Sequence, residues 1–103
     1  PSFCINIVRD VSPNCDCHAE NDVAIVPDVG MFASLDPVAI DLACAEAVNR
    51  QPVMPNCAIT DLGSEHEEDH FHAAHDNTHW PDLIEHGKKI GLGSDEFDLI
   101  TVK

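Results

Sequence analysis

The chain has 103 residues, 44% of them hydrophobic, which is enough for one modest domain with a small core and too few for two independent domains. Its formal charge of −14, with only 5 lysines and arginines, would repel phosphate backbones and anionic lipids, so we expect neither nucleic acid nor membrane as a partner. Because the chain has no bilayer-length apolar run and no basic-then-apolar leader, we expect it to be soluble, and because it begins at Pro1 without a methionine, we expect a piece of a longer polypeptide. Its cysteine usage, described below, favours the cytoplasm.

The first part of the chain contains two apolar runs of strand composition. Phe3–Val8 is rich in β-branched and aromatic residues, which predicts a strand. Pro13-Asn14 then turns the chain and places Cys15-Asp16-Cys17-His18 in a loop at the strand end, a common location for functional groups. Val23–Val26, which Pro27 ends, predicts a second, buried strand followed by a turn.

A buried helix is predicted over Pro37–Arg50. Asp36 is a favoured N-cap residue, and Pro37 suits the first helical position, where no intrahelical partner for an N–H is needed. Apolar residues recur at helical spacing through this segment. Gln51-Pro52 ends the helix, because a residue before proline disfavours the α region.

The second half is more polar. From Thr60 to Asn77 the composition predicts an exposed loop or short helix that supplies few apolar groups to any core, so we expect it to be dispensable for folding. A final helix is predicted over Trp80–Ile90, with Gly91 as the residue that follows its C-cap. Phe97–Val102 returns to strand composition.

The resulting order of strand, loop, strand, helix, loop, helix and strand predicts an α/β fold. Strands that alternate with helices favour a small mixed or parallel sheet with helices packed on it. We expect Phe3–Val8 and Phe97–Val102 to share this sheet. Residues 1–103 are interpreted as a single domain or as the C-terminal fragment of a larger domain of a larger protein.

The motif Cys15-x-Cys17-His18 is the sharpest chemical signal in the sequence. Two thiolates and an imidazole within four residues can converge on a zinc or iron ion. A closed tetrahedral site needs a further ligand, for which Asp16 and Asp41 are the carboxylates least explained by turns or caps. The alternative is a reduced turn that binds nothing.

Cysteine usage favours a reducing compartment. The chain has 5 cysteines, an odd number, and Cys4, Cys44 and Cys57 lie in apolar stretches, where a free thiol packs like a small hydrophobe. A secreted disulfide framework fits this pattern poorly, whereas a close cysteine pair in the cytosol is more often a metal or redox feature.

The histidines form a second cluster, at positions 66, 70, 72, 75 and 79. His66/His70 and His75/His79 are each four residues apart and would share a helix face if helical. His66-Glu67-Glu68-Asp69-His70 matches HExxH, but the polar segment around it lacks the apolar helix face of a zinc protease. No nucleophile elbow, Walker A loop or GxGxxG accompanies these residues.

Three blocks together resemble the C-terminal part of the family called domain of unknown function 362, whose members are often described as iron–sulfur or ferredoxin-type proteins. They are Ile7–Cys17 (IVRDVSPNCDC), Ile25–Asp41 (IVPDVGMFASLDPVAID) and Gly91–Ser94 (GLGS) before the closing strand. The resemblance spans nearly the whole chain, and the histidine-rich loop departs most from it. It implies a fragment of a longer protein.

The resemblance also implies a cofactor elsewhere in the parent protein. Many family members carry C-x-x-C-x-x-C runs that bind [4Fe–4S] clusters, and no such run occurs here, so a cluster would lie outside this fragment. We therefore expect a metal- or iron–sulfur-associated electron-transfer protein whose reaction is unknown, with Cys15, Cys17 and His18 as metal ligands and a redox protein as partner. The alternative is a non-metal structural domain that completes an enzyme or electron carrier and contributes acidic surface.

Overall fold

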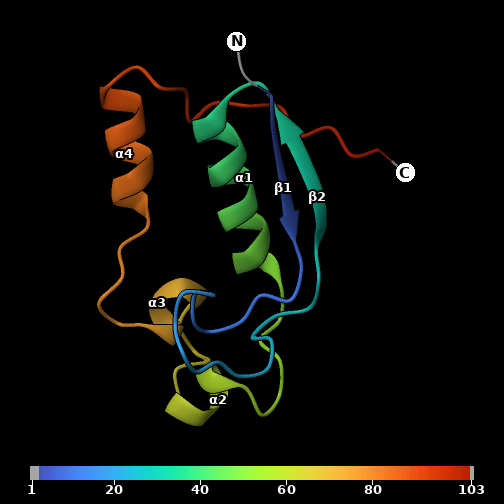
Figure 1. The fold of residues 1–103 in the computed structure, drawn as a ribbon, viewed down its shortest axis with the longest axis vertical. Helices are drawn as coiled ribbons and strands as arrows, with labels where there is room; N and C mark the ends of the chain where they lie inside the picture. Colours follow the sequence, from blue (N-terminus) through green and yellow to red (C-terminus); the bar gives the residue numbers. More distant parts are fainter. Residues whose placement is uncertain (1–2, 103) are drawn as a thin grey trace.

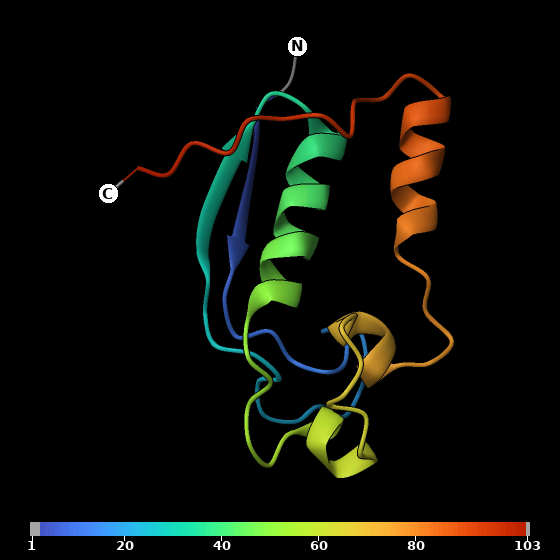
Figure 2. The same cartoon turned by 180° about the vertical axis from the view of Figure 1, so that it is seen from behind.

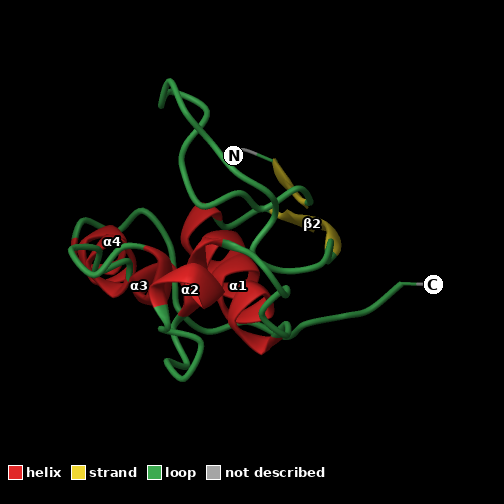
Figure 3. Ribbon diagram, turned by 90° about the horizontal axis from the view of Figure 1, so that it is seen from below, coloured by secondary structure: helices red, strands yellow, loops and turns green. Residues whose placement is uncertain are grey.

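A computed structural model describes residues 3–102. Within them, a two-stranded sheet is covered on one face by a helix. Strand β1 (Cys4–Val8) pairs antiparallel with β2 (Gly30–Ser34), with Ile5 opposite Ala33. Side chains alternate along a strand, so Val8 enters the core while Ile5 and Ile7 remain exposed on the outer face. The helices lie on the other side of the strands (Figures 1 and 3).

Helix α1 (Pro37–Arg50) has the predicted bounds. The Asp36 carboxylate accepts hydrogen bonds from the N–H groups of Val38 and Ala39, at 2.9 and 3.0 Å, and so caps the helix as expected. The buried face of α1 comprises Val38, Ala39, Ile40, Ala43, Ala47 and Val48. Helix α1 therefore packs between the sheet and the other helices.

Helix α4 (Pro81–Lys89) lies beside α1, and the predicted ends Trp80 and Ile90 are its cap residues (Figure 2). Gly87 makes the close approach of the two helices possible, because a Cβ there would lie 2.8 Å from Cγ2 of Val38. Gly91 has a φ of 75°, the left-handed conformation expected of a residue just after a C-cap.

The chain after α4 is fastened to the start of α1. The Ser94 N–H donates to Oδ2 of Asp36 at 2.9 Å, while Oδ1 serves the helix cap. Gly93 fits against this carboxylate only without a side chain, since a Cβ would lie 2.0 Å from Oδ1. One carboxylate therefore caps α1 and holds the C-terminal segment.

The histidine-rich region is not exposed throughout as expected, because His70 and Ala73 are buried, while its dispensability for folding stays a prediction. It forms α2 (Ala58–Leu62) and α3 (His70–Ala74) below α1 (Figure 1). Ile59 is fully buried and Ala73 is 3% exposed. A few apolar residues of the segment are buried, and polar residues occupy the exposed positions between them. The polar average composition of the segment hid these buried residues. The central cluster consists of Val8, Ile25, Val26, Val48, Cys57, Ile59 and Ala73.

The run Val23–Val26 is not a strand, although its predicted burial is confirmed for Ile25 and Val26. Ile25 donates its N–H to the Val11 carbonyl and accepts from the Met54 N–H, both at 2.8 Å. These two bonds satisfy the buried N–H and carbonyl groups of Ile25, although the segment has no continuous ladder of strand hydrogen bonds. The second strand instead begins at Gly30, where φ is 144°.

The predicted strand at Phe97–Val102 was also wrong. These residues have no regular structure, and the side chains of Ile100 and Val102 are 80% and 89% exposed. The segment leaves the domain beyond β2 (Figure 1). β-branched residues favour a strand only where a neighbouring strand receives them, and this segment is not paired with either edge of the sheet.

The α/β class with helices on a small sheet is confirmed, but the sheet is antiparallel and has two strands among residues 3–102. A mixed or parallel sheet was expected from the alternation of strands and helices. The two strands are instead adjacent in the element order, and only short helices follow α1 before α4. No helix within residues 3–102 is both long and apolar enough to cross a membrane.

Candidate metal site in the loop after β1

The cysteine loop, residues 14–21, is closed at its neck by hydrogen bonds of short polar side chains. The Asn21 amide accepts from the Asn14 N–H at 3.2 Å and donates to the Ser12 hydroxyl at 3.0 Å. The Asn14 amide in turn donates to the Glu20 carbonyl at 3.1 Å. Residues within the loop are thereby held at the surface without belonging to a helix or strand.

Cys15 and Cys17 are exposed in this loop and interact with each other. The backbone N–H and the thiol of Cys17 donate to the Cys15 sulfur and lower the pKa of the Cys15 thiol, although the nearby Asp16 charge opposes the change. The hydrogen bond to Cys15 and the Cys15 charge raise the pKa of Cys17. The pair thus loses its first proton more readily than an isolated thiol and its second less readily.

His18 is oriented by the backbone of the same loop. Its N–H donates to the Cys15 carbonyl at 2.9 Å, closing a turn. Its ring Nδ1 lies 2.8 Å from the Glu20 carbonyl oxygen and 3.2 Å from the Glu20 nitrogen. With Nδ1 engaged by the backbone, Nε2 is the ring nitrogen through which His18 would bind a metal.

Cys15 and Cys17 lie two residues apart in one exposed loop, but no group of three or more His, Cys, Asp or Glu side chains placed to hold a metal forms within residues 3–102. Asp16 is exposed in the loop. Asp41 lies on α1 instead, where it accepts from the Asn6 side chain of β1 at 3.1 Å. The cysteine loop therefore offers a partial set of ligands.

The histidine cluster is separated by the fold. His70 is buried, and its Nε2 lies 2.7 Å from the Gln51 carbonyl oxygen, while no hydrogen-bond partner reaches its Nδ1 among the described atoms. His66 lies in a turn outside α3. The HExxH residues consequently do not share a helix face, which argues against a zinc-protease site. His72 Nδ1 lies 2.9 Å from the Glu67 carboxylate.

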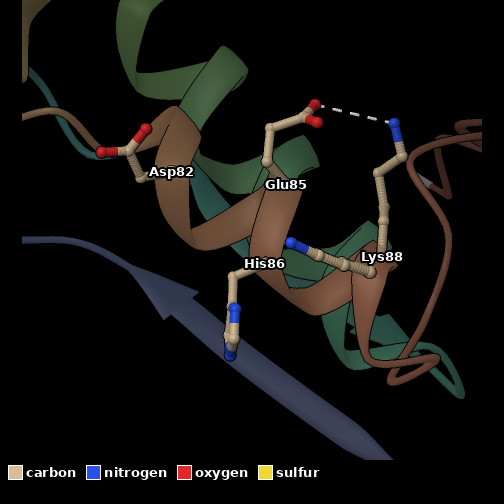
Figure 4. A pocket seen from close by; sticks show the side chains of 5 residues that line it. Asp82, Glu85, His86 and Lys88 are labelled. Atoms are coloured by element: carbon tan, nitrogen blue, oxygen red, sulfur yellow. Dashed lines mark ion pairs between the residues drawn. The ribbon is translucent and has the colours of Figure 1, made fainter.

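A polar depression on α4 is the other concentration of charge. Figure 4 shows Asp82, Glu85, His86 and Lys88 projecting from this one helix. The Lys88 ammonium lies 3.6 Å from the Glu85 carboxylate and 2.8 Å from Asp95, and the bond to Asp95 raises the pKa of Lys88. Opposite charges are paired along an open surface, and the residues that line the depression all belong to α4.

One continuous stretch of sequence resembles a known family. It contains both strands, the cysteine loop and the beginning of α1. Residues 2–46 match the family model "Domain of unknown function (DUF362)". The resemblance to the DUF362 family is confirmed for this stretch, which contains the Ile7–Cys17 and Ile25–Asp41 blocks. The Gly91–Ser94 block and the histidine-rich region lie outside it. No curated protein and no solved structure matches the chain.

Sequence reasoning missed the residues that hold the DUF362-like loop in place. Besides Asn14 and Asn21, these include His75, whose Nε2 lies within hydrogen-bonding distance of the Pro13 carbonyl oxygen, 62 residues earlier. Asparagines that flank a cysteine pair are a local signal for side-chain-to-backbone bonds. The contact of His75 with Pro13 has no local signal, because it depends on how α3 packs.

Proposed function

We propose that the chain is part of a metal- or iron–sulfur-associated redox protein, in which Cys15 and Cys17 bind a soft cation such as zinc or iron. His18 acts as a third ligand through Nε2. The remaining ligand comes from outside this chain, from the rest of the parent polypeptide or from a redox partner protein. We place the protein in the cytoplasm, where its thiols stay reduced.

The observation that carries this proposal is a pair of exposed thiols that shift each other's pKa, on a loop whose neck is closed by hydrogen bonds. A thiolate is the form of cysteine that binds metals, and hydrogen bonds to the Cys15 sulfur favour that form. The acidic surface adds a general attraction for cations. Fixing two ligands before binding reduces the conformational entropy lost when the metal is captured.

The residues fit a two-thiolate ion site better than a complete cluster site. A [4Fe–4S] cluster requires four cysteine ligands. Cys57 is fully buried in the core, and Cys44 is half-buried on α1 with its sulfur 3.6 Å from the Asn6 amide. Burial raises the pKa of Cys44, which makes it a poor ligand. A [4Fe–4S] cluster is therefore proposed only for the parent protein outside this fragment.

The test is a titration of untagged chain with zinc or ferrous iron, monitored by calorimetry and by proton release. We expect stoichiometric binding that weakens as the pH falls, because protons compete for both thiolates and the imidazole. Cys15→Ser and Cys17→Ser should each weaken binding at least tenfold, and Cys44→Ser is the matched control. Equal, weak binding by the wild type and both loop variants would mean that Cys15 and Cys17 belong to a reduced turn that binds no metal. That result would refute the proposal. Elemental analysis of protein purified without added metal supplies an independent check.

One observation favours the alternative of a structural domain that completes a larger protein. The outer face of the sheet is apolar and uncovered, with Ile7 and Met31 facing each other across the strands at 64% and 71% exposure. Covering such side chains contributes about 1–2 kcal/mol each. The occupant proposed is a further segment of the parent polypeptide, and the acidic surface serves for docking a partner.

This alternative is tested by substituting Ile7→Lys in the isolated chain and in the longer parent. If the parent covers the face, the substitution should leave the stability of the isolated chain nearly unchanged and destabilise the parent by several kcal/mol. An equal, small effect in both would refute coverage by the parent. Leu62→Lys, at an exposed leucine on α2, is the matched control.

A further inference from the structure

A cavity of about 420 Å³ opens beside the base of the cysteine loop. Three parts of the chain line it: the chain just after β1, Ile25, and the end of α3 with the linker to α4. Its walls are mainly apolar, with Val11, Pro13, Ile25, Phe71 and Trp80 among the lining side chains. Small-molecule sites in proteins are typically apolar hollows of this size.

Two aromatic side chains shape one wall. The rings of Phe71 and Trp80 have centroids 6.1 Å apart and planes inclined at 56°. They meet as a tilted pair and do not stack face to face, so they form a corner. A flat ring placed in the cavity can lie against one ring and present its edge to the other, the geometry that aromatic groups prefer.

Hydrogen bonds hold the wall residues in place. The Trp80 indole N–H donates to the Asp69 carboxylate at 3.1 Å, and the Thr78 hydroxyl lies 3.2 Å from the Phe71 carbonyl oxygen. His75 and Pro13, which both line the cavity, are joined by a hydrogen bond between the His75 ring and the Pro13 carbonyl. These polar groups are already paired within the protein, so the walls are preformed and a ligand would be held mainly by apolar and aromatic contact.

Charge next to the lining residue His79 restricts the ligand further. The exposed Asp82 carboxylate lies 2.7 Å from Nδ1 of the lining residue His79. The chain as a whole carries a formal charge of −14. This field repels anions and attracts cations. We propose that the cavity is a binding site for a flat aromatic molecule that is uncharged or cationic.

This site goes beyond the proposed function, because none of its lining residues is a proposed metal ligand. Binding there is measured without metal, and loss of metal binding by the cysteine variants would leave the cavity unaffected. A failure of either proposal is therefore distinguishable from a failure of the other.

The test uses three probes of one ring system that differ in charge: quinoline, the N-methylquinolinium cation and quinoline-3-carboxylate. Trp80 is the only tryptophan, so its indole N–H gives a single NMR signal inside the cavity wall. Titration of the full chain at neutral pH should shift this signal, and those of residues 71–79, in a saturable way. We expect a Kd of about 1 mM or tighter for the neutral and cationic probes and binding at least about tenfold weaker for the carboxylate.

Two variants keep the outcome independent of any one substitution. Ala74→Phe should fill the cavity and abolish saturable shifts, whereas Ala33→Phe, on exposed β2, is the matched control and should bind like the wild type. Phe71→Leu removes one aromatic wall while keeping it apolar, and should weaken quinoline several-fold. Shifts that do not saturate, equal affinity for the carboxylate, or unchanged binding by folded Ala74→Phe would each overturn the proposal.

Discussion

Asp36 offers the sharpest test of how the fold is held together. Its Oδ1 accepts from the N–H groups of Val38 and Ala39 at the start of α1, and its Oδ2 accepts from the Ser94 N–H at 2.9 Å. Replacement by alanine removes both functions. Loss of an N-cap costs about 1 kcal/mol, and loss of a hydrogen bond contributes about 0.5–1.5 kcal/mol more. We therefore expect Asp36→Ala to lower the free energy of unfolding by about 2 kcal/mol.

Asparagine separates the two functions of this side chain. In Asp36→Asn the amide oxygen can still cap the helix, but the amide nitrogen would face the Ser94 N–H and cannot accept its hydrogen bond. The expected cost is about 1 kcal/mol, which corresponds to a Tm shift of about 4–8 °C in a domain of this size. Amide exchange should accelerate at Ser94 while the amides of α1 stay protected.

The pH dependence follows from the same bonds. The hydrogen bond from the Ala39 N–H, together with those from Ser94 and Val38, lowers the pKa of Asp36, so the folded state binds its proton less readily than the unfolded state. This contribution is present above the unfolded pKa and is lost as the pH falls through the folded pKa. Urea unfolding of wild type and variants between neutral and acid pH measures it. A cost below about 0.3 kcal/mol for Asp36→Ala, or equal costs for alanine and asparagine, would refute the reasoning.

Other substitutions test packing. Gly93→Ala should cost about 1–3 kcal/mol, because its Cβ would lie 2.0 Å from Oδ1 of Asp36; unchanged urea stability would contradict this close approach. Ile59→Ala, in a fully buried side chain of α2, should cost about 2–5 kcal/mol by urea unfolding, and a cost under 1 kcal/mol would place α2 outside the core. His70→Ala should lower thermal stability by about 2 kcal/mol, whereas the half-exposed His72→Ala should change it by less than about 0.5 kcal/mol; equal losses would argue against the buried role of His70.

Helix α1 was predictable because its signals are local. Asp36 and Pro37 mark its beginning, and Gln51-Pro52 marks its end, so both bounds depend on neighbouring residues alone. The helix after Trp80 was predictable for the same reason, with a proline in its first turn and Gly91 beyond its end. Such elements need no knowledge of what packs against them.

Strands were harder to predict because their hydrogen bonds depend on distant chain. Gly30–Ser34 has little β-branched character, yet it forms β2 because β1 is there to pair with it. Val23–Val26 and Phe97–Val102 have the expected composition and form no strand, since neither is paired in a ladder. Composition indicated which residues can be extended, and the fold decided which of them pair.

The candidate metal loop could be identified from its residue types in the sequence. The hydrogen bonds that hold this loop in place could not. A cysteine pair followed by histidine is visible in the sequence, and in the structure both thiols are exposed on one loop, where Cys17 lowers the pKa of Cys15. The side-chain bonds of Asn14 and Asn21 that close the loop leave no periodic pattern. His18 was proposed as the third ligand from its chemistry, but the orientation of its ring could not be predicted, because that orientation is fixed by the backbone of Glu20.

The contact between His75 and Pro13 places the two proposed sites on one structural support. The Pro13 carbonyl lies at the base of the cysteine loop, and the same residue lines the aromatic cavity. The imidazole comes from the segment after α3, which reaches this position because Ala73 of α3 belongs to the central cluster and Phe71 packs against that cluster. A histidine-rich segment that resembles a solvated loop in composition therefore positions the base of the DUF362-like loop. For this reason the region outside the family match contributes to the geometry of the region inside it.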